Sequence, residues 1–201
     1  MAKKHQHFVL FKPDGYLSQF VINEPRGHRK KLLGELYDFP EGIMPVGRLD
    51  EASEGLLLLT TNGKLSHHIN SSDIEKEYYA QVDGVITDKA IAELTGGLDL
   101  SDEGTPYISQ KCKARKIPVP QLPNRQKRIR GDHHGPTSWI SITLTEGKNR
   151  QVRKMTATVG FPTLRLIRVR IGNLRIKNMQ PGEVKEITNL NEIENDLPSD
   201  N

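Results

Sequence analysis

One stretch of eighteen residues, VGRLDEASEGLLLLTTNG from Val46 to Gly63, constrains the fold more than any other part of the chain. The run of four leucines at its centre, Leu56–Leu59, predicts a strand that is buried on both faces. Gly47 permits an unusual backbone angle before this strand, and Asn62–Gly63 is a strong turn signal after it. We therefore expect a loop around Asp50 that is braced by a core strand of a sheet.

The position of Asp50 makes it the first candidate for chemistry. A carboxylate beside Arg48, at the rim of a rigid sheet, lies where folds commonly display catalytic groups. The plainer interpretation is that Asp50 caps a turn and pairs with Arg48 on the surface. These residues alone leave both interpretations open.

Alternation and turn residues indicate the other elements of the fold. Strands are expected at His7–Phe11, Gly55–Thr60, Lys76–Val82, Ser138–Thr145 and Thr163–Ile171. Helices are expected at His28–Leu36, Lys64–Asn70, Asp88–Leu94 (capped by Thr87 and ended by Gly96–Gly97) and Asn149–Val159. Because strands outnumber helices and do not alternate with them regularly, we predict an α+β fold with a mixed, mainly antiparallel sheet and flanking helices.

Charge is distributed unevenly along the chain, whose formal net charge is +4 with a pI near 9.1. Residues 111–130 contain eight Lys or Arg and no acid, and residues 148–177 contain nine and no acid. Any one such run is usually a solvated face. Two of them in one small domain favour a polyanionic partner, with nucleic acid as the first candidate.

Several classes of protein are disfavoured by the sequence. No uninterrupted apolar run exceeds four residues, whereas a membrane-spanning helix needs about twenty. The start MAKKHQHF has no apolar stretch of signal-peptide length. Cys112 is the single cysteine, which excludes an internal disulfide and a cysteine-rich zinc site. We therefore expect a cytoplasmic protein without a membrane segment or a bound metal.

Domain boundaries follow from composition. We expect a disordered N-terminus at 1–6, one domain at 7–188 and an acidic, poorly ordered tail at 189–201. Within the domain, residues 116–136 hold four prolines among five basic residues and lack any regular period. We interpret this segment as a long basic loop that can lie along a phosphate backbone.

Three stretches of the chain resemble, in order, the motifs of the RsuA-like pseudouridine synthases. These are GRLDEASEGLLLLT at 47–60, KEYYAQVDG at 76–84 and EGKNRQVRKM at 146–155, and with FVLFKPDGYLSQF and VGFPTLRLIRVRIG the likeness covers roughly residues 7–188. The resemblance implies the α+β catalytic domain of that family, with a central cleft. It also implies that Asp50 is the catalytic carboxylate, Tyr78 the active-site aromatic residue and Arg153 the partner of the carboxylate.

The amino-acid sequences of these stretches are most similar to those of the RluE branch of the family. That branch acts on a uridine in 23S, or large-subunit, ribosomal RNA, so the implied partner is this RNA or its precursor. The first strand of the domain begins almost at once, so we expect no S4-type RNA-binding domain before it. The protein is expected to be a monomer.

The implied reaction sets simple chemical requirements. Isomerising uridine breaks the bond between N1 and C1′, turns the detached uracil, rejoins it through C5 and removes the C5 proton. This chemistry needs a carboxylate, a proton acceptor and a dry pocket, and it implies no cofactor. On a helix at 149–159, Arg153 lies at the edge of the face formed by Val152, Met155 and Val159, from which it can hold Asp50 ionised.

A target uridine must leave its stack, and RNA binding has to supply that energy. The candidate binding residues are basic and lie on the loops and blocks described above. They are Arg48, Lys76, Arg125, Lys127, Arg128, Arg130, Lys148, Arg150, Lys154, Arg165 and Arg168, with Arg29, Lys30 and Lys31 as further candidates.

Three rival interpretations remain open at this level. The chain could be a ribosome assembly factor that binds RNA without catalysis, although all three reacting positions are intact. Asp50, Glu51 and Glu54 could be the carboxylates of a glycoside hydrolase, although aromatic residues for sugar platforms are few. The same isomerisation could also act on small-subunit ribosomal RNA or on transfer RNA.

Overall fold

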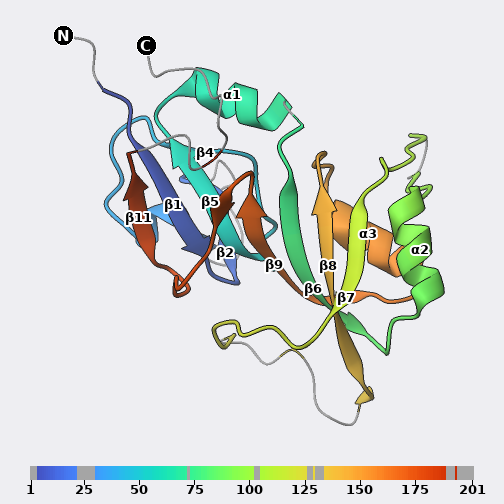
Figure 1. Ribbon diagram of the computed structural model, residues 1–201. Coiled ribbons are helices and arrows are strands. Elements are labelled where there is room, and N and C mark those ends of the chain that lie inside the picture. Colours follow the sequence, from blue (N-terminus) through green and yellow to red (C-terminus); the bar gives the residue numbers. More distant parts are fainter. Residues whose placement is uncertain are drawn as a thin grey trace. The chain divides into compact units, whose positions relative to one another are not determined.

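The computed structural model describes residues 4–21, 30–71, 73–101, 105–125, 129, 134–188 and 193. The chain divides into two compact units (Figure 1). The first unit comprises Met1–Ile74 and Arg168–Asn201, and the second comprises Glu75–Ile167. Each unit is built on antiparallel strands with helices beside them, so the predicted α+β class with a mainly antiparallel sheet is confirmed.

The first unit is organised around two fully buried strands, β1 (His7–Lys12) and β5 (Glu54–Thr60). They pair antiparallel, with His7 opposite Thr60 and Lys12 opposite Gly55. On its other edge β1 pairs antiparallel with β11 (Val184–Ile187). The leucine run therefore forms the buried strand that the sequence predicts, and its start lies directly after the Asp50 loop.

Shorter elements complete the first unit. They are β2 (Tyr16–Leu17), β3 (Lys31–Leu32), the 3-10 turn η1 (Leu33–Glu35), β4 (Met44–Pro45), α1 (Gly63–Ser71) and β10 (Leu174–Arg175). Strand β4 pairs with β5, and α1 packs against β5. The Asn62 side chain accepts a hydrogen bond of 3.1 Å from the Leu65 amide and thereby caps α1.

The predicted helix at 28–36 is wrong over its described part. Lys31–Leu32 pairs in parallel with Tyr16–Leu17, and only Leu33–Glu35 forms a single helical turn. Leu33 is fully buried against Phe8, Leu10 and Phe20, so tertiary packing outweighs the local helical spacing. Gly34 in the middle of the segment also weakens a helix.

The second unit contains antiparallel strands and two helices. Strand β8 (Thr137–Leu144) pairs with β6 (Lys76–Asp83) on one edge and with β7 (Lys113–Ile117) on the other. Helix α2 (Asp88–Gly96) packs against β7, and α3 (Gln151–Thr158) follows β8 (Figure 1). The chain then enters β9 (Thr163–Ile171), which leads back into the first unit.

The ends of the two helices follow their capping residues. The Thr87 hydroxyl accepts a hydrogen bond of 3.2 Å from the Ala90 amide, and α2 stops before Gly97, as the sequence predicts. Helix α3 begins two residues later than predicted. The reason is that Arg150 adopts the left-handed conformation, with φ of 50°, and thus cannot be part of the helix.

Strand β7 was not expected from the sequence, and it includes the first two residues of the predicted loop at 116–136. Its charged side chains hide the strand period, since Lys113 pairs with Glu75 and Arg115 with Glu77. Of that loop, residues 126–128 and 130–133 lie outside the described part of the chain.

The described residues on either side of the predicted domain at 7–188 contact the domain. Gln6 donates its amide to the Thr61 hydroxyl at 3.0 Å, while residues 1–3 lie outside the described part. In the predicted tail the structure describes Ile193, which is fully buried and accepts a hydrogen bond from the Asn173 amide. Within the described ranges, the helices are too short or too polar to cross a bilayer.

Candidate active site

Asp50 lies in a tight turn that leads directly into β5. The Ser53 amide donates to the Asp50 carbonyl at 3.0 Å, which closes the turn, and the Val46 amide donates to the Leu58 carbonyl at 2.8 Å, which ties the loop to β5. The Asp50 side chain is half-buried, whereas Arg48 is exposed. The loop thus presents one carboxylate from a backbone that the core strand fixes.

Ser18 fixes the residue that precedes Asp50. Its hydroxyl accepts a hydrogen bond of 3.0 Å from the Leu49 amide and donates one of 2.8 Å to the Leu49 carbonyl. Both side chains are buried. A single buried hydroxyl therefore satisfies both backbone groups of Leu49 and fixes the backbone directly before Asp50.

Lys12 binds the part of the turn that follows Asp50. Its ammonium donates to the carbonyls of Ser53 at 2.8 Å, Pro13 at 3.0 Å and Glu51 at 3.3 Å. The side chain is fully buried at the end of β1. Because carbonyls on both sides of Ala52 converge on one cation, the turn after Asp50 has little freedom to move. We call this arrangement the Lys12 clasp.

Burial lowers the pKa of Lys12 to about 8. The negative charges of Asp14, Glu54, Asp50 and Glu51 act in the opposite direction and favour the ammonium form. Lys12 is therefore still largely protonated at neutral pH. Sequence reasoning missed this residue, although a lysine at the end of an apolar strand, directly before Pro13, is an unusual pattern that could have drawn attention to it.

Gly47 explains why the loop needs a glycine at its start. Its φ of +67° is rarely adopted by residues with a side chain, and a Cβ at this position would lie 3.1 Å from Oδ1 of Asn70 in α1. The loop thus passes close to α1, where a larger residue would be strained by the positive φ and would press tightly against the Asn70 side chain.

Tyr78 comes from β6 in the second unit. Its side chain is 9% exposed and shares a strand face with Ala80 and Val82, which are fully buried. Tyr79 points to the other face and is only half-buried. The Tyr78 ring is therefore fixed by packing, which would suit an aromatic group that must hold a base in one orientation.

Arg153 lies on α3 at the edge of its buried face. Val152 and Met155 are buried, as the helical spacing predicts, and Arg153 is half-buried beside them. Its Nη1 donates to the Thr163 carbonyl at 3.3 Å. Asp50 belongs to the first unit, while Tyr78 and Arg153 belong to the second. The joint action of these three residues therefore stays a prediction.

The predicted RNA-binding residues fall into three groups. Arg48, Lys148 and Arg150 are exposed, and Lys76, Arg125 and Lys154 are half-buried. Arg165 and Arg168 are 7% and 4% exposed. Lys127, Arg128 and Arg130, like Arg29, lie outside the described residues.

The two buried arginines bond to backbone carbonyls. Arg165 donates to Pro123 at 2.9 Å, and Arg168 donates through Nε to Leu56 at 2.7 Å. The buried Nη2 of Arg168 has no hydrogen-bond partner among the described residues. Contacts of these two arginines with RNA stay predictions, and both also have a structural role.

Two of the further candidates are already engaged in contacts. Lys30 forms an ion pair of 2.7 Å with Glu51, and the Lys31 ammonium lies 5.3 Å from the centre of the Tyr16 ring. Across the described part of the chain, His, Cys, Asp and Glu side chains do not gather in groups of three that could hold a metal ion.

Comparison with known proteins identifies the family. The family model described as RNA pseudouridylate synthase matches residues 6–158, which include Asp50, Tyr78 and Arg153. The chain belongs to this family. The resemblance inferred from the three motifs is thereby confirmed.

Related pseudouridine synthases extend this result over most of the chain. The ribosomal large subunit pseudouridine synthase E of Vibrio vulnificus is 40% identical over 191 residues, which is 94% of this chain and 78% of that protein. The protein of the same name from Xanthomonas axonopodis is 39% identical, over 86% of this chain and 89% of its own length. A crystal structure of a pseudouridylate synthase matches with a TM-score of 0.74 at 25% identity, covering 96% of this chain and 75% of that one.

The Lys12 clasp predicts a distinct pH dependence of stability. An unfolded lysine stays protonated up to about pH 10.5, whereas folded Lys12 loses its proton near pH 8, so the unfolded state binds more protons between these values. The free energy of unfolding should therefore rise between pH 8 and 10.5, by up to about 3 kcal/mol from this group.

Urea denaturation of the wild type and of Lys12→Met across this pH range measures the effect. The rise should be lost in Lys12→Met and kept in Lys89→Met, which removes an exposed lysine of α2. Equal pH profiles for the wild type and Lys12→Met would contradict the assignment of a lowered pKa to Lys12.

Proposed function

We propose that this chain isomerises a uridine of large-subunit ribosomal RNA to pseudouridine, with Asp50 as the catalytic carboxylate. The observation that carries the proposal is the fixed display of Asp50 at the start of β5, in a chain of the pseudouridylate synthase family. The names of the two relatives described above favour the large ribosomal subunit as the source of the substrate.

The reaction needs an acid group held in one place. In the proposed mechanism the Asp50 carboxylate assists cleavage of the bond between N1 and C1′, the uracil turns, and C5 bonds to C1′. A proton is then removed from C5 and N1 gains one, so the product is an isomer of the substrate and no redox partner is needed. The clasp by Lys12 and the bonds to Ser18 support this role, because they keep the turn from yielding when the uracil rotates.

Arg153 and Tyr78 have complementary roles in the proposal. The guanidinium of Arg153 is the cationic partner of the Asp50 carboxylate. The ring of Tyr78 stacks on the target base, and its hydroxyl assists removal of the C5 proton. The half-buried position of Arg153 and the packed ring of Tyr78 support these assignments.

Binding of RNA is proposed to depend on exposed cations around the second unit. Lys148 and Arg150 stand at the surface before α3, and Lys154 lies one turn into the helix. These positive charges can neutralise phosphates next to the target nucleotide. The protein is proposed to act as a monomer in the cytoplasm, where ribosomal RNA is available.

Replacing the proposed catalytic carboxylate tests the function directly. Asp50→Asn keeps the size of the side chain but removes its charge, and should lower pseudouridine formation by at least ~10³-fold while RNA affinity changes little. The measurement is nucleoside analysis of large-subunit ribosomal RNA incubated with each protein.

Glu51→Gln is the matched control, because it neutralises the adjacent acid of the same turn, and it should retain activity. A wild-type protein that binds this RNA but forms no pseudouridine would contradict the proposal and favour a non-catalytic RNA-binding protein. Full activity of Asp50→Asn would disprove the role of Asp50.

Removing the phenol of Tyr78 separates cleavage from proton transfer. Tyr78→Phe keeps the stacking ring, so RNA binding should be retained, while turnover should fall by ~10²-fold or more because the C5 proton has no acceptor. Single-turnover assays that measure glycosidic cleavage and C5 proton release separately should show a stall after cleavage. Tyr79→Phe, on the opposite face of β6, is the control, and normal proton release by Tyr78→Phe would reject the proposed role.

A further inference from the structure

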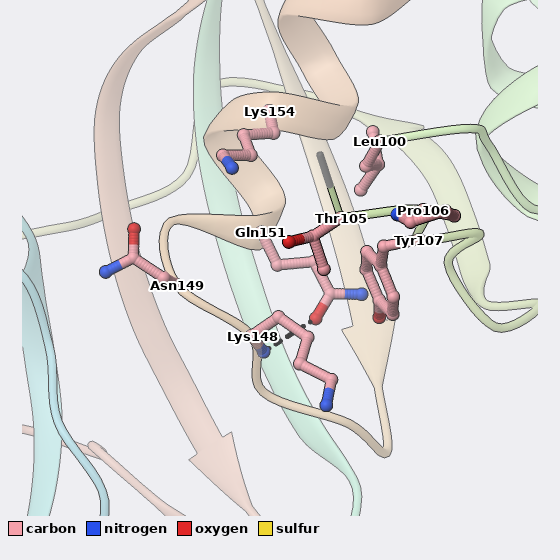
Figure 2. A pocket seen from close by; sticks show the side chains of 8 residues that line it. All are labelled: Leu100, Thr105, Pro106, Tyr107, Lys148, Asn149, Gln151 and Lys154. Atoms are coloured by element: carbon pink, nitrogen blue, oxygen red, sulfur yellow. Dashed lines mark hydrogen bonds between the residues drawn. The ribbon is translucent and has the colours of Figure 1, made fainter. Parts of the chain in front are cut away.

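The second unit contains a pocket of about 440 Å³ beside the start of α3 (Figure 2). Its lining includes Leu100, Pro106, Tyr107, Lys148, Gln151 and Lys154, and we call it the Tyr107 pocket. Figure 2 shows the Tyr107 ring on one side of the pocket and the side chains of Lys148 and Lys154 on the side of α3 and the loop before it. This volume lies in the usual range for sites that bind small molecules, about 300–1,000 Å³.

The aromatic wall of the pocket is held rigidly. The Tyr107 hydroxyl donates to one oxygen of Glu146. The other oxygen of Glu146 accepts the Gln110 amide at 2.8 Å and the Gln151 side-chain amide. Burial and the neighbouring Glu146 carboxylate raise the pKa of Tyr107, so the phenol stays neutral and its ring keeps one orientation.

The base of the pocket is polar, but its polar groups already form hydrogen bonds within the protein. Gln151 is buried; its side-chain oxygen accepts the Lys148 amide at 3.0 Å and its nitrogen donates to Glu146. Leu100 adds a buried apolar surface. The aromatic ring and the apolar groups of the pocket are therefore preorganised, and a base that stacks on the ring face covered by Lys148 requires only that exposed side chain to move aside.

The rim of the pocket is cationic. The Lys148 ammonium lies 5.7 Å from the centre of the Tyr107 ring, and Lys154 lines the pocket from α3. Among the residues that the structure describes, the lining includes no acidic side chain, and Glu146 accepts hydrogen bonds from Tyr107 and Gln151. An aromatic ring beside two cations is the combination that binds a base together with its phosphate.

We propose that the Tyr107 pocket binds one unpaired nucleotide of the RNA, other than the target uridine, with its base against Tyr107 and its phosphate against Lys148 and Lys154. This inference rests on the proposed function for the identity of the ligand. It is favoured by the position of the pocket at the start of the helix that carries Arg153, so that a nucleotide bound there belongs to the strand that delivers the target.

A nucleotide-sized site could also take a free nucleotide, which has the same chemistry. RNA is favoured because both lysines lie in the stretch EGKNRQVRKM, which also carries Arg150 and Arg153. The two sources are distinguished by competition: uridine and adenosine 5′-monophosphates at millimolar concentration should displace labelled RNA weakly. Tight binding of either mononucleotide, without a crosslink from RNA, would overturn the proposal.

Photocrosslinking of the wild-type protein is the direct test. Large-subunit ribosomal RNA transcripts that contain 4-thiouridine or 6-thioguanosine are irradiated with the protein, and the crosslinked peptides are identified by mass spectrometry. We expect a crosslink on the peptide that contains Tyr107, from a nucleotide that is not converted to pseudouridine. Crosslinks confined to other peptides would overturn the proposal, and this readout does not depend on any variant folding.

Kinetics of three variants test the contribution of the ring and the charge. Tyr107→Leu should raise KM for RNA about tenfold, as expected for one lost base–aromatic stack, and leave kcat nearly unchanged. Tyr107→Phe should behave like the wild type. Lys148→Met should raise KM more than Lys89→Met, which removes an exposed lysine of α2 away from the pocket lining.

Two outcomes of these assays would contradict nucleotide binding in the Tyr107 pocket. An unchanged KM for Tyr107→Leu means that no base stacks there, and an equal loss in Tyr107→Phe means that the bond to Glu146, and not the ring, is what matters. Failure of the proposed function looks different: the wild type itself would form no pseudouridine, while the crosslink at Tyr107 would still report whether the pocket binds RNA.

Discussion

The buried ammonium of Lys12 is the interaction on which the Asp50 site depends. It brings the carbonyls of Pro13, Glu51 and Ser53 to one point at the junction of β1 and β5. Burying a cation is unfavourable, and the carboxylates of the same loop, including Asp50, offset part of this cost. The hydrogen bonds of the Lys12 ammonium thus hold the turn, and they weaken if the loop or its carboxylates move. The position of the turn therefore depends on the charges around it.

The two units contribute different properties to the proposed enzyme. The first supplies a rigid loop between buried strands, where Ser18 and Lys12 fix the backbone on either side of Asp50. The second supplies the helix that carries Arg153, the strand that carries Tyr78 and a pocket with a cationic rim. Basic side chains have two roles, structural support and exposure to a ligand. Arg168 donates to the carbonyl of Leu56, while Lys148 and Arg150 remain at the surface.

The parts predicted best from sequence are those in which local pattern and tertiary packing agree. The leucine run, the cap at Thr87 and the buried pair Val152 and Met155 each form as expected, whereas Val159 lies beyond the end of α3 and is half-buried. The segment at 31–35 was mispredicted because burial of Leu33 outweighs helical spacing, and β7 was missed because its alternating charges are paired with Glu75 and Glu77. Asp50 could be found from a motif. Lys12 stands in an unusual place before Pro13, but its contacts with backbone carbonyls, like the contact of Tyr107 with the distant Glu146, cannot be read from the sequence.

A map of the pseudouridines in ribosomal RNA from cells that lack this protein tests the proposed function most directly. One position of large-subunit RNA should lose its pseudouridine in these cells. Wild-type protein should restore the modification and Asp50→Asn should not. An unchanged large-subunit map, or a loss confined to small-subunit or transfer RNA, would contradict the proposed substrate. Restoration by Asp50→Asn would contradict the proposed chemistry.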